Sequence, residues 1–240
     1  MLQQHHLYTP FFNLFWGISL QISRPNFSHL FIQILIIVLI FSPKVSAEKY
    51  GGQIIYAETS DPKSFNTIIS KETTTTEIMK FIYEGLTTTN PFDARVKPNL
   101  AERWEVSEDG KAWLFYLRPN MKWSDGHPFT ADDVVFTYKE LIYNPDIPSS
   151  ARDIFTIEGK EFEVTKIDDQ TVKFVLPVKF APFLRFMSQE IMPKHMIKPL
   201  VDKGEFNSSL GINSDPAEIV GMGPFRLTQY IPAQRLVYQR

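Results

Sequence analysis

The sequence contains no cysteine among its 240 residues. This absence excludes disulfide bonds, thiolate catalysis, iron–sulfur clusters and cysteine-based zinc sites, and it also excludes a lipid-modified cysteine at a cleavage point. A glycine-rich phosphate-binding loop and a G-x-S-x-G nucleophile turn are absent as well. The chain does contain 43% hydrophobic residues, with 20 phenylalanines, which is enough apolar material for a folded core.

Acidic residues are missing from positions 1–47, where the only lysine and arginine are Lys44 and Arg24. Residues 30–41 form an apolar run, and small residues lead up to Ala47. A basic flank, a short apolar core and a small-residue exit are typical of a secretory signal peptide, so we predict that residues 1–47 are removed on export. A signal anchor that stays in the membrane is the alternative interpretation.

Export changes the charge balance of the chain. Loss of Arg24 and Lys44 from the 25 basic residues leaves 23 against 27 acidic residues, a net charge of −4. No basic stripe remains to release counterions from nucleic acid, so we expect no nucleic-acid partner. We expect an exported protein that is periplasmic or otherwise extracytoplasmic. If the signal segment stays uncleaved, it would anchor the protein to the membrane. We expect no cofactor.

The stretch from residue 98 to residue 138 contains three successive local signals. The turn at residues 107–111 contains Asp-Gly and separates two runs of alternating apolar residues, which predicts a β-hairpin. Residues 123–126 predict a second turn. Thr130 then predicts a helix N-cap, with Asp132 and Asp133 in the positively polarised first turn.

Other segments give weaker signals. Residues 53–57 are a short apolar run, which predicts a buried first strand. Four threonines at 73–76 indicate either a helix N-terminus or a ligand-lining loop. We further predict a hairpin with strands at 164–167 and 171–176, a helix through 184–187, a helix start near Pro193, and two strands at 225–230 and 236–238.

The order of these motifs resembles that of a known family. The sequence LAERWEVSEDGK followed by FYLRPNMKWSDGHPFTADDV resembles the signature region of the family 5 extracellular solute-binding proteins, which include the oligopeptide and dipeptide receptors of ABC importers. Residues 61–66 (DPKSFN), 83–86 (YEGL) and 221–225 (GMGPF) resemble three further motifs of that family.

This resemblance implies an α/β fold of the periplasmic-binding-protein type, a type II clam-shell with an inserted small α+β domain. Residues 48–84 and 190–240 would form an incomplete main mixed-sheet lobe, and residues 85–189 the inserted smaller domain. In the family a second lobe follows, and we expect it to be missing from this chain.

The resemblance also implies a binding protein and not an enzyme. Its ligand would be a peptide or similar small molecule, its partner the membrane permease of an ABC transporter, and its state a monomer. The alternatives are a receptor for a nickel chelate or an oligosaccharide, or a truncated product that does not transport. By alignment of loops, the residues expected to contact the ligand are Ser70, Thr73, Thr74, Ser150, Arg152, Asp153 and Gln189.

Two enzyme-like or metal-like patterns are weak. Asp132 and Asp133 could start a hydrolase hypothesis, but adjacent helical residues diverge by about 100° and do not face each other. His127 and His195 lie far apart in the sequence without helical H-x-x-x-H spacing, so we expect no metal site from them alone. The aromatic residues in the signature region could form a sugar platform, but packing within a hairpin is the favoured interpretation.

Overall fold

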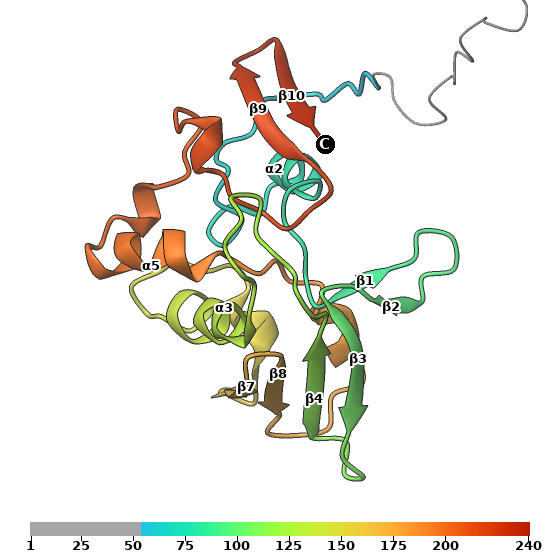
Figure 1. The fold of residues 1–240 in the computed structure, drawn as a ribbon. Coiled ribbons are helices and arrows are strands. Elements are labelled where there is room, and N and C mark those ends of the chain that lie inside the picture. The colour runs from blue at the N-terminus through green and yellow to red at the C-terminus, as the bar shows by residue number, and fades with distance from the viewer. Residues whose placement is uncertain (1–53) are drawn as a thin grey trace, which may run out of the picture. The chain divides into compact units, whose positions relative to one another are not determined.

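The hairpin predicted at the Asp-Gly turn begins the central sheet of the computed structural model, which describes residues 54–240 (Figure 1). Strands β3 (Ala101–Val106) and β4 (Ala112–Leu117) pair antiparallel across the turn. Gly110 has a φ angle of +71°, which glycine adopts without a steric penalty, and its N–H donates to the Ser107 carbonyl at 2.9 Å. The prediction is confirmed.

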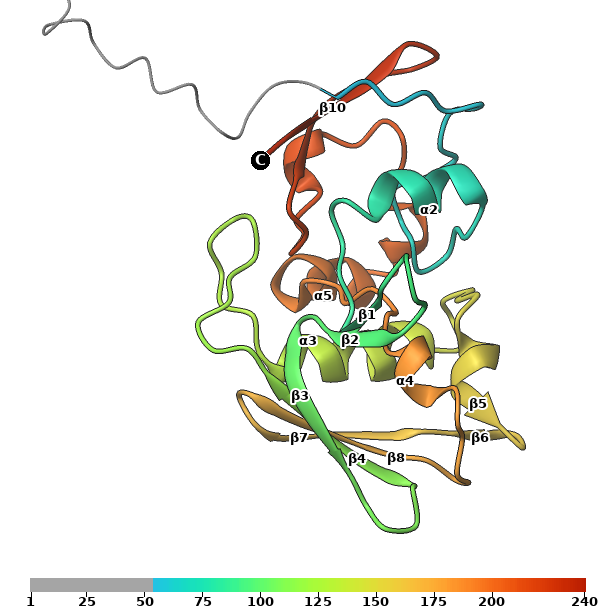
Figure 2. The ribbon, with the colours of Figure 1, turned by 90° about the vertical axis from the view of Figure 1, so that its right-hand side faces the viewer.

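Two more strands complete this sheet. β7 (Glu163–Asp168) and β8 (Thr171–Val175) form the second predicted hairpin, and the strand order is β3-β4-β8-β7, antiparallel throughout. Helices α3 (Ala131–Phe136) and α4 (Phe183–Phe186) lie on the same face of the sheet (Figure 2). The rings within 6.0 Å of the Phe183 ring are those of Trp113, Phe115, Phe162 and Phe174.

The aromatic residues of the signature region are mostly part of this core. Phe115 and Trp123 are 0% and 2% exposed, and Trp104 packs beside Phe115 with ring centroids 6.2 Å apart. Tyr116 lies on the other face, where the Arg103 guanidinium stacks over its ring at 3.4 Å. The packing interpretation is therefore confirmed over the sugar platform.

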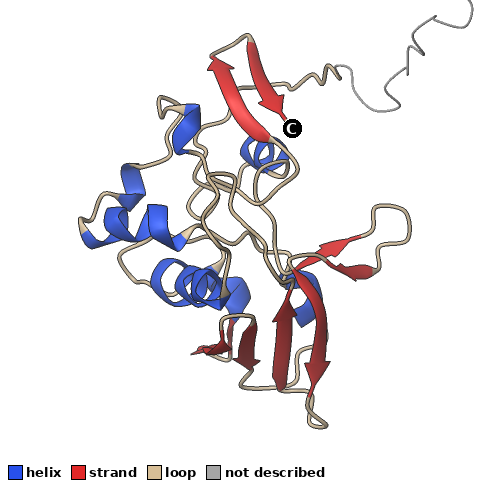
Figure 3. Ribbon diagram, viewed as in Figure 1, coloured by secondary structure: helices blue, strands red, loops and turns tan. Residues whose placement is uncertain are grey.

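Figure 3 shows all helices and strands of the described residues in separate colours. The remaining elements are short. They are strands β1 (Thr87–Thr89), β2 (Val96–Pro98), β5 (Thr156–Ile157) and β6 (Lys160–Glu161), and 3₁₀ turns η2 (Arg152–Phe155), η3 (Phe206–Ser208) and η4 (Pro216–Glu218).

Helix α3 begins with a capping box. The Thr130 hydroxyl accepts the Asp132 N–H at 3.2 Å, and the Asp133 carboxylate accepts the Thr130 N–H at 2.9 Å. The predicted cap is therefore confirmed, with Asp133 as the reciprocal partner. The helix continues as a π-helical segment, η1 (Thr137–Ile142), whose wider turns the sequence pattern did not predict.

Opposite sides of α3 and η1 belong to different core clusters. Val134, Tyr138 and Ile142 belong to a first cluster, whereas Phe136 and Leu141 belong to a second. The other members of the first cluster lie between positions 86 and 191, with Val220 added, and those of the second lie between 65 and 83 and between 147 and 227. The division into a main lobe and an inserted domain stays a prediction, and Tyr56–Arg240 forms one compact unit.

Two polar side chains of this helix hold the segment that leads into α5 (Lys194–Asp202). Asp133 Oδ1 accepts the Lys194 N–H at 3.0 Å, and the Thr137 hydroxyl oxygen accepts the Met192 N–H at 2.9 Å. Burial raises the pKa of the Asp133 carboxyl, although its backbone N–H donors oppose the rise. One carboxylate thus caps the starts of two helices.

The C-terminal strands form a separate hairpin. β9 (Arg226–Ile231) and β10 (Arg235–Gln239) pair antiparallel, as predicted. The Tyr238 hydroxyl donates to the Ile78 carbonyl at 3.1 Å, which ties the hairpin to helix α2 (Thr73–Met79). Figure 1 shows α2 beside these strands.

Glycine is required where the chain enters β9. A Cβ placed on Gly221 would lie 2.1 Å from the Ile82 carbonyl oxygen, and one on Gly223 would lie 2.4 Å from the Phe81 carbonyl oxygen. The Gly223 N–H donates to the Ile82 carbonyl at 2.7 Å. Close backbone contact therefore accounts for the two glycines of the GMGPF motif.

The predicted first strand is wrong. Ile54 and Ile55 are 95% and 87% exposed, and residues 54–57 form no strand. A strand needs a neighbour for its backbone groups, and none of the strands described in residues 54–240 pairs with this run. The predicted signal peptide lies outside the described residues, and none of the helices within them is long and apolar enough to cross a membrane.

Replacing Gly221 by alanine should destabilise the protein by about 2–4 kcal/mol, because the new methyl group collides with the Ile82 backbone. Urea unfolding followed by circular dichroism measures this change. Gly211→Ala is the matched control, since a Cβ there meets no atom within 4 Å. Equal stability of the two variants would contradict the close-contact explanation.

Replacing Asp133 by asparagine should cost about 2–3 kcal/mol of unfolding free energy. Each carboxylate oxygen of Asp133 accepts one backbone N–H, and the asparagine NH₂ would leave one of these two donors without an acceptor. The control is Asp132→Asn. Asp132 is half-exposed and pairs with Lys166, so this change should cost less than about 1 kcal/mol. An Asp133→Asn protein as stable as the control would refute the double-cap interpretation.

Candidate functional site

The threonine run is largely used for structure. Helix α2 starts at Thr73, and Glu72 occupies the N-cap position in extended conformation. The Thr75 hydroxyl, fully buried, donates to the Ser64 carbonyl at 2.8 Å and also contacts the Glu72 carboxylate. Thr74 is buried and its hydroxyl lies 2.8 Å from that of Ser60.

The first residues of this segment are more accessible. Thr73 is exposed, and Ser70 is half-buried with its hydroxyl donating to Glu72 Oε2 at 2.7 Å. Glu72 also accepts the Lys63 N–H at 2.9 Å. Burial disfavours the ionised form of Glu72, but its combined hydrogen bonds outweigh burial and lower the pKa of this carboxyl. Glu72 thus anchors the segment that presents Ser70 and Thr73.

An ion pair brings this segment next to Gln189. Lys71 Nζ lies 2.9 Å from Glu190 Oε2, and the Gln189 side-chain amide donates to the same carboxylate at 2.7 Å. The Lys71 and Glu190 side chains are 30% and 19% exposed. Sequence reasoning named Ser70 and Gln189 but missed Lys71 and Glu190, whose opposite charges were the available signal.

A second acidic residue, Glu84, lies on the segment whose backbone is hydrogen-bonded to the residue after Glu190. The Ile191 N–H donates to the Glu84 carbonyl at 3.0 Å, so the backbones of the two segments run together. Burial raises the pKa of the Glu84 carboxyl, while a hydrogen bond from the Asn99 side-chain amide opposes the rise. We define the polar wall as residues 70–73, Glu84 and residues 189–190.

The loop at residues 150–153, where ligand contacts were predicted, is not hydrogen-bonded to the polar wall in the described residues. Ser150 and Asp153 are exposed. The Arg152 guanidinium donates from Nε to the Ile142 carbonyl at 3.0 Å and from Nη2 to the Ile147 carbonyl at 2.5 Å and to the Asn144 carbonyl. Arg152 therefore fixes the loop after η1, and no hydrogen bond within residues 54–240 joins it to the polar wall.

The adjacent aspartates Asp132 and Asp133 have different structural partners. Asp132 forms ion pairs with Lys166 at 2.5 Å and Lys194 at 3.8 Å, and the contact with Lys166 lowers its pKa. Asp133 accepts backbone N–H groups instead. Each carboxylate thus has a structural partner of its own.

Comparison with known protein families identifies the family of this chain. The model of the bacterial extracellular solute-binding proteins, family 5, matches residues 95–240, which is more than half of the chain. The chain belongs to this family. The membership confirms the resemblance stated from the sequence motifs. It is a family of solute-binding proteins, which is not an enzymatic class.

Individual relatives show the same similarity. The dipeptide-binding protein of Escherichia coli is 32% identical over 212 residues, which cover 81% of this chain and 38% of that protein. The periplasmic binding protein MelB of Agrobacterium fabrum, solved with stachyose, is 28% identical with a TM-score of 0.65 and covers 75% of this chain and 29% of MelB.

NikZ of Campylobacter jejuni, solved with Ni(L-His), is 26% identical with a TM-score of 0.61, covering 75% of this chain and 33% of NikZ. These similarities confirm the fold class of periplasmic binding proteins of this family. The chain spans about a third of the length of these three proteins.

Replacing Thr75 by valine, which keeps the shape but removes the hydroxyl, should destabilise the protein by about 1–2 kcal/mol, because the Ser64 carbonyl and the Glu72 carboxylate lose the single buried proton that they share. Thr73→Val, at an exposed position, is the control and should leave the unfolding free energy nearly unchanged. Chemical unfolding at neutral pH measures both variants.

The same pair of variants tests the role of Glu72. A carboxyl whose pKa is lowered by folding contributes stability above its ordinary pKa, and this contribution is lost as the pH falls through the lowered value. Thr75→Val should therefore show a smaller loss of stability on acidification than the unchanged protein. If Thr75→Val and the unchanged protein lost stability equally on acidification, the hydrogen bond from Thr75 would not be what lowers the pKa of Glu72.

Proposed function

We propose that the chain is the ligand-capturing part of a substrate-binding protein of an ABC importer, which binds peptides or similar small solutes outside the inner membrane. Membership of the solute-binding family over residues 95–240 is the observation that carries this proposal. Similarity to the dipeptide-binding protein of Escherichia coli supports a peptide as the ligand. Delivery to a membrane permease follows from the importer role, and the protein acts as a monomer without catalysing a reaction.

The polar wall supports a role in ligand capture. It combines the hydroxyls of Ser70 and Thr73 and the amide of Gln189 with the Lys71–Glu190 ion pair. Hydroxyl and amide groups can exchange hydrogen bonds with a peptide main chain, and charged groups can pair with peptide termini. Thr74, Ser150, Arg152 and Asp153 complete the proposed contact set, with Arg152 acting by holding its loop.

Charge placement favours a ligand that carries both donors and acceptors. Lys71 and Glu190 neutralise each other across 2.9 Å, so a dipolar ligand could insert its own ammonium and carboxylate groups without a change in net charge. Closure of two lobes around such a ligand is the movement by which hinged binding proteins bury it.

Nuclear magnetic resonance of residues 48–240 tests the proposal. The chain spans about a third of the length of its relatives, so we expect only part of their contacts and an affinity in the millimolar range, about −4 kcal/mol. Tetraalanine should shift the amide resonances of residues 70–74 and 189–190, and Gln189→Ala should weaken the shifts. Asp168→Ala, at the far hairpin turn, is the control.

Other outcomes separate the alternatives. Shifts of the same residues by stachyose or by a nickel–histidine chelate, and none by tetraalanine, would replace the peptide with a nonpeptide ligand. Shifts by none of the three probes would overturn the ligand-capturing role. Recovery of cleaved peptide after incubation would overturn the assignment as a binding protein without enzymatic activity.

A further inference from the structure

The two histidines that the sequence separates by 68 positions meet in the folded chain. His127 closes the turn that begins at Trp123, and His195 is the second residue of α5. The turn is fixed by a bond from the Trp123 N–H to the His127 carbonyl at 2.8 Å, and α5 is fixed by the Lys194 N–H bond to Asp133. Both histidines therefore lie on backbone segments that are held in place by hydrogen bonds.

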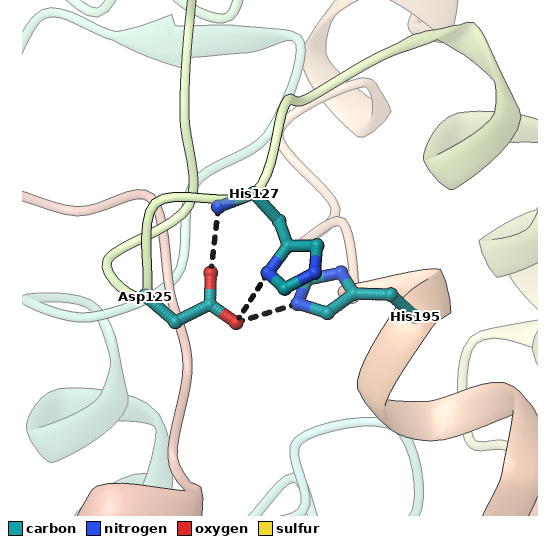
Figure 4. A group of neighbouring side chains, drawn as sticks. All are labelled: Asp125, His127 and His195. Carbon is teal, nitrogen blue, oxygen red and sulfur yellow. Dashed lines mark hydrogen bonds and ion pairs between the residues drawn. The ribbon is translucent and has the colours of Figure 1, made fainter.

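The Asp125 carboxylate lies beside the two stacked imidazoles, and one of its oxygens contacts both rings (Figure 4). Asp125 Oδ2 is 2.6 Å from His195 Nε2 and 3.2 Å from His127 Nδ1, and the two rings stack with centroids 4.0 Å apart. The other oxygen, Oδ1, accepts the His127 backbone N–H at 3.1 Å. One ligand atom from each residue lies within 4.8 Å of the other two.

This spacing is close to that of a metal centre. Ligands about 2.1 Å from a tetrahedral ion lie about 3.4 Å from one another. The imidazole lone pair lies in the ring plane, so the stacked rings must turn about their Cβ–Cγ bonds before both nitrogens face one ion. The His127 side chain is 59% exposed and has room to turn. The ion then replaces the contacts that His127 and His195 make with Asp125.

The surroundings leave space for further ligands and reduce repulsion of a cation. A hollow of about 440 Å³ beside the histidines is lined by both rings and by Asp132, Lys194 and Lys198. Lys194 lies 3.8 Å from the Asp132 carboxylate, and Lys198 lies 3.3 Å from that of Glu140. The nearby ammonium groups are thus paired with carboxylates, and water can complete the coordination from the hollow.

We propose that Asp125, His127 and His195 form a binding site for a divalent transition-metal ion. Two imidazoles and one carboxylate suit Zn²⁺, Ni²⁺ or Cu²⁺ better than Mg²⁺ or Ca²⁺, which prefer oxygen ligands. The ion would tie the turn at residues 123–127 to the start of α5. This site is separate from the polar wall and does not depend on the proposed solute function.

Zinc titration of the full-length chain, without a histidine tag, tests the site. Three further histidines, His5, His6 and His29, lie outside the described residues, so all proteins in the experiment carry alanine at these positions. Calorimetry should show one equivalent of Zn²⁺ bound at neutral pH. A thermal shift on addition of Zn²⁺ should accompany binding.

His127→Ala, His195→Ala and Asp125→Asn should each lower the zinc affinity about tenfold or more. Asp125→Asn retains an oxygen that can accept the His127 N–H, so the turn is kept while the anionic ligand is lost. Asp168→Asn is the matched control, because Asp168 accepts the Gln170 N–H in an equivalent turn away from histidine. Absence of zinc uptake at millimolar concentration, or equal affinity in all variants, would overturn the proposal.

Discussion

The carboxylate of Asp133 is the interaction on which the rest of the described structure depends. It accepts the N–H of Thr130 at the start of α3 and the N–H of Lys194 at the start of α5, two positions 64 residues apart in the chain. Because the group is buried, an unpaired N–H at either helix start would lack water as a substitute. The neighbouring Thr137 hydroxyl repeats this link one turn later by accepting the Met192 N–H. The helix therefore fixes the segment from which Gln189, Glu190 and His195 extend.

Close backbone contact provides the second constraint. Gly221 and Gly223 lie against Phe81 and Ile82, and Gly85 lies against Ser188, where an added Cβ would be 2.5 Å from the Ser188 carbonyl carbon. These contacts join the segment before Leu86 to segments more than a hundred residues later. The polar wall is built where they meet, with Lys71 and Glu190 supplied from opposite sides of the junction. The proposed ligand-contact residues Gln189 and Ser70 thus lie near these close backbone contacts.

Local signals were read correctly from the sequence. The hairpin turn at Gly110, the cap at Thr130 and the hairpin of β7 and β8 depend on residues within a few positions of one another, so their hydrogen bonds are specified by short stretches. The exposed run at Ile54 was misread because an apolar stretch shows what could be buried but does not supply the neighbour that buries it. Arg152 was assigned from loop position alone, and its hydrogen bonds to carbonyls of the same loop emerge only in the fold.

The sequence by itself determined the family, through the ordered motifs between residues 95 and 240, and it determined most of the hairpins and helix starts. Tertiary structure alone decided which distant side chains meet. It placed Lys71 beside Glu190, and it joined Asp125 and His127 to His195. The physical reason is that turns and caps are formed between near neighbours in the chain. Pairings across 70 or 119 positions depend instead on how whole segments pack, and no local pattern of residues encodes them.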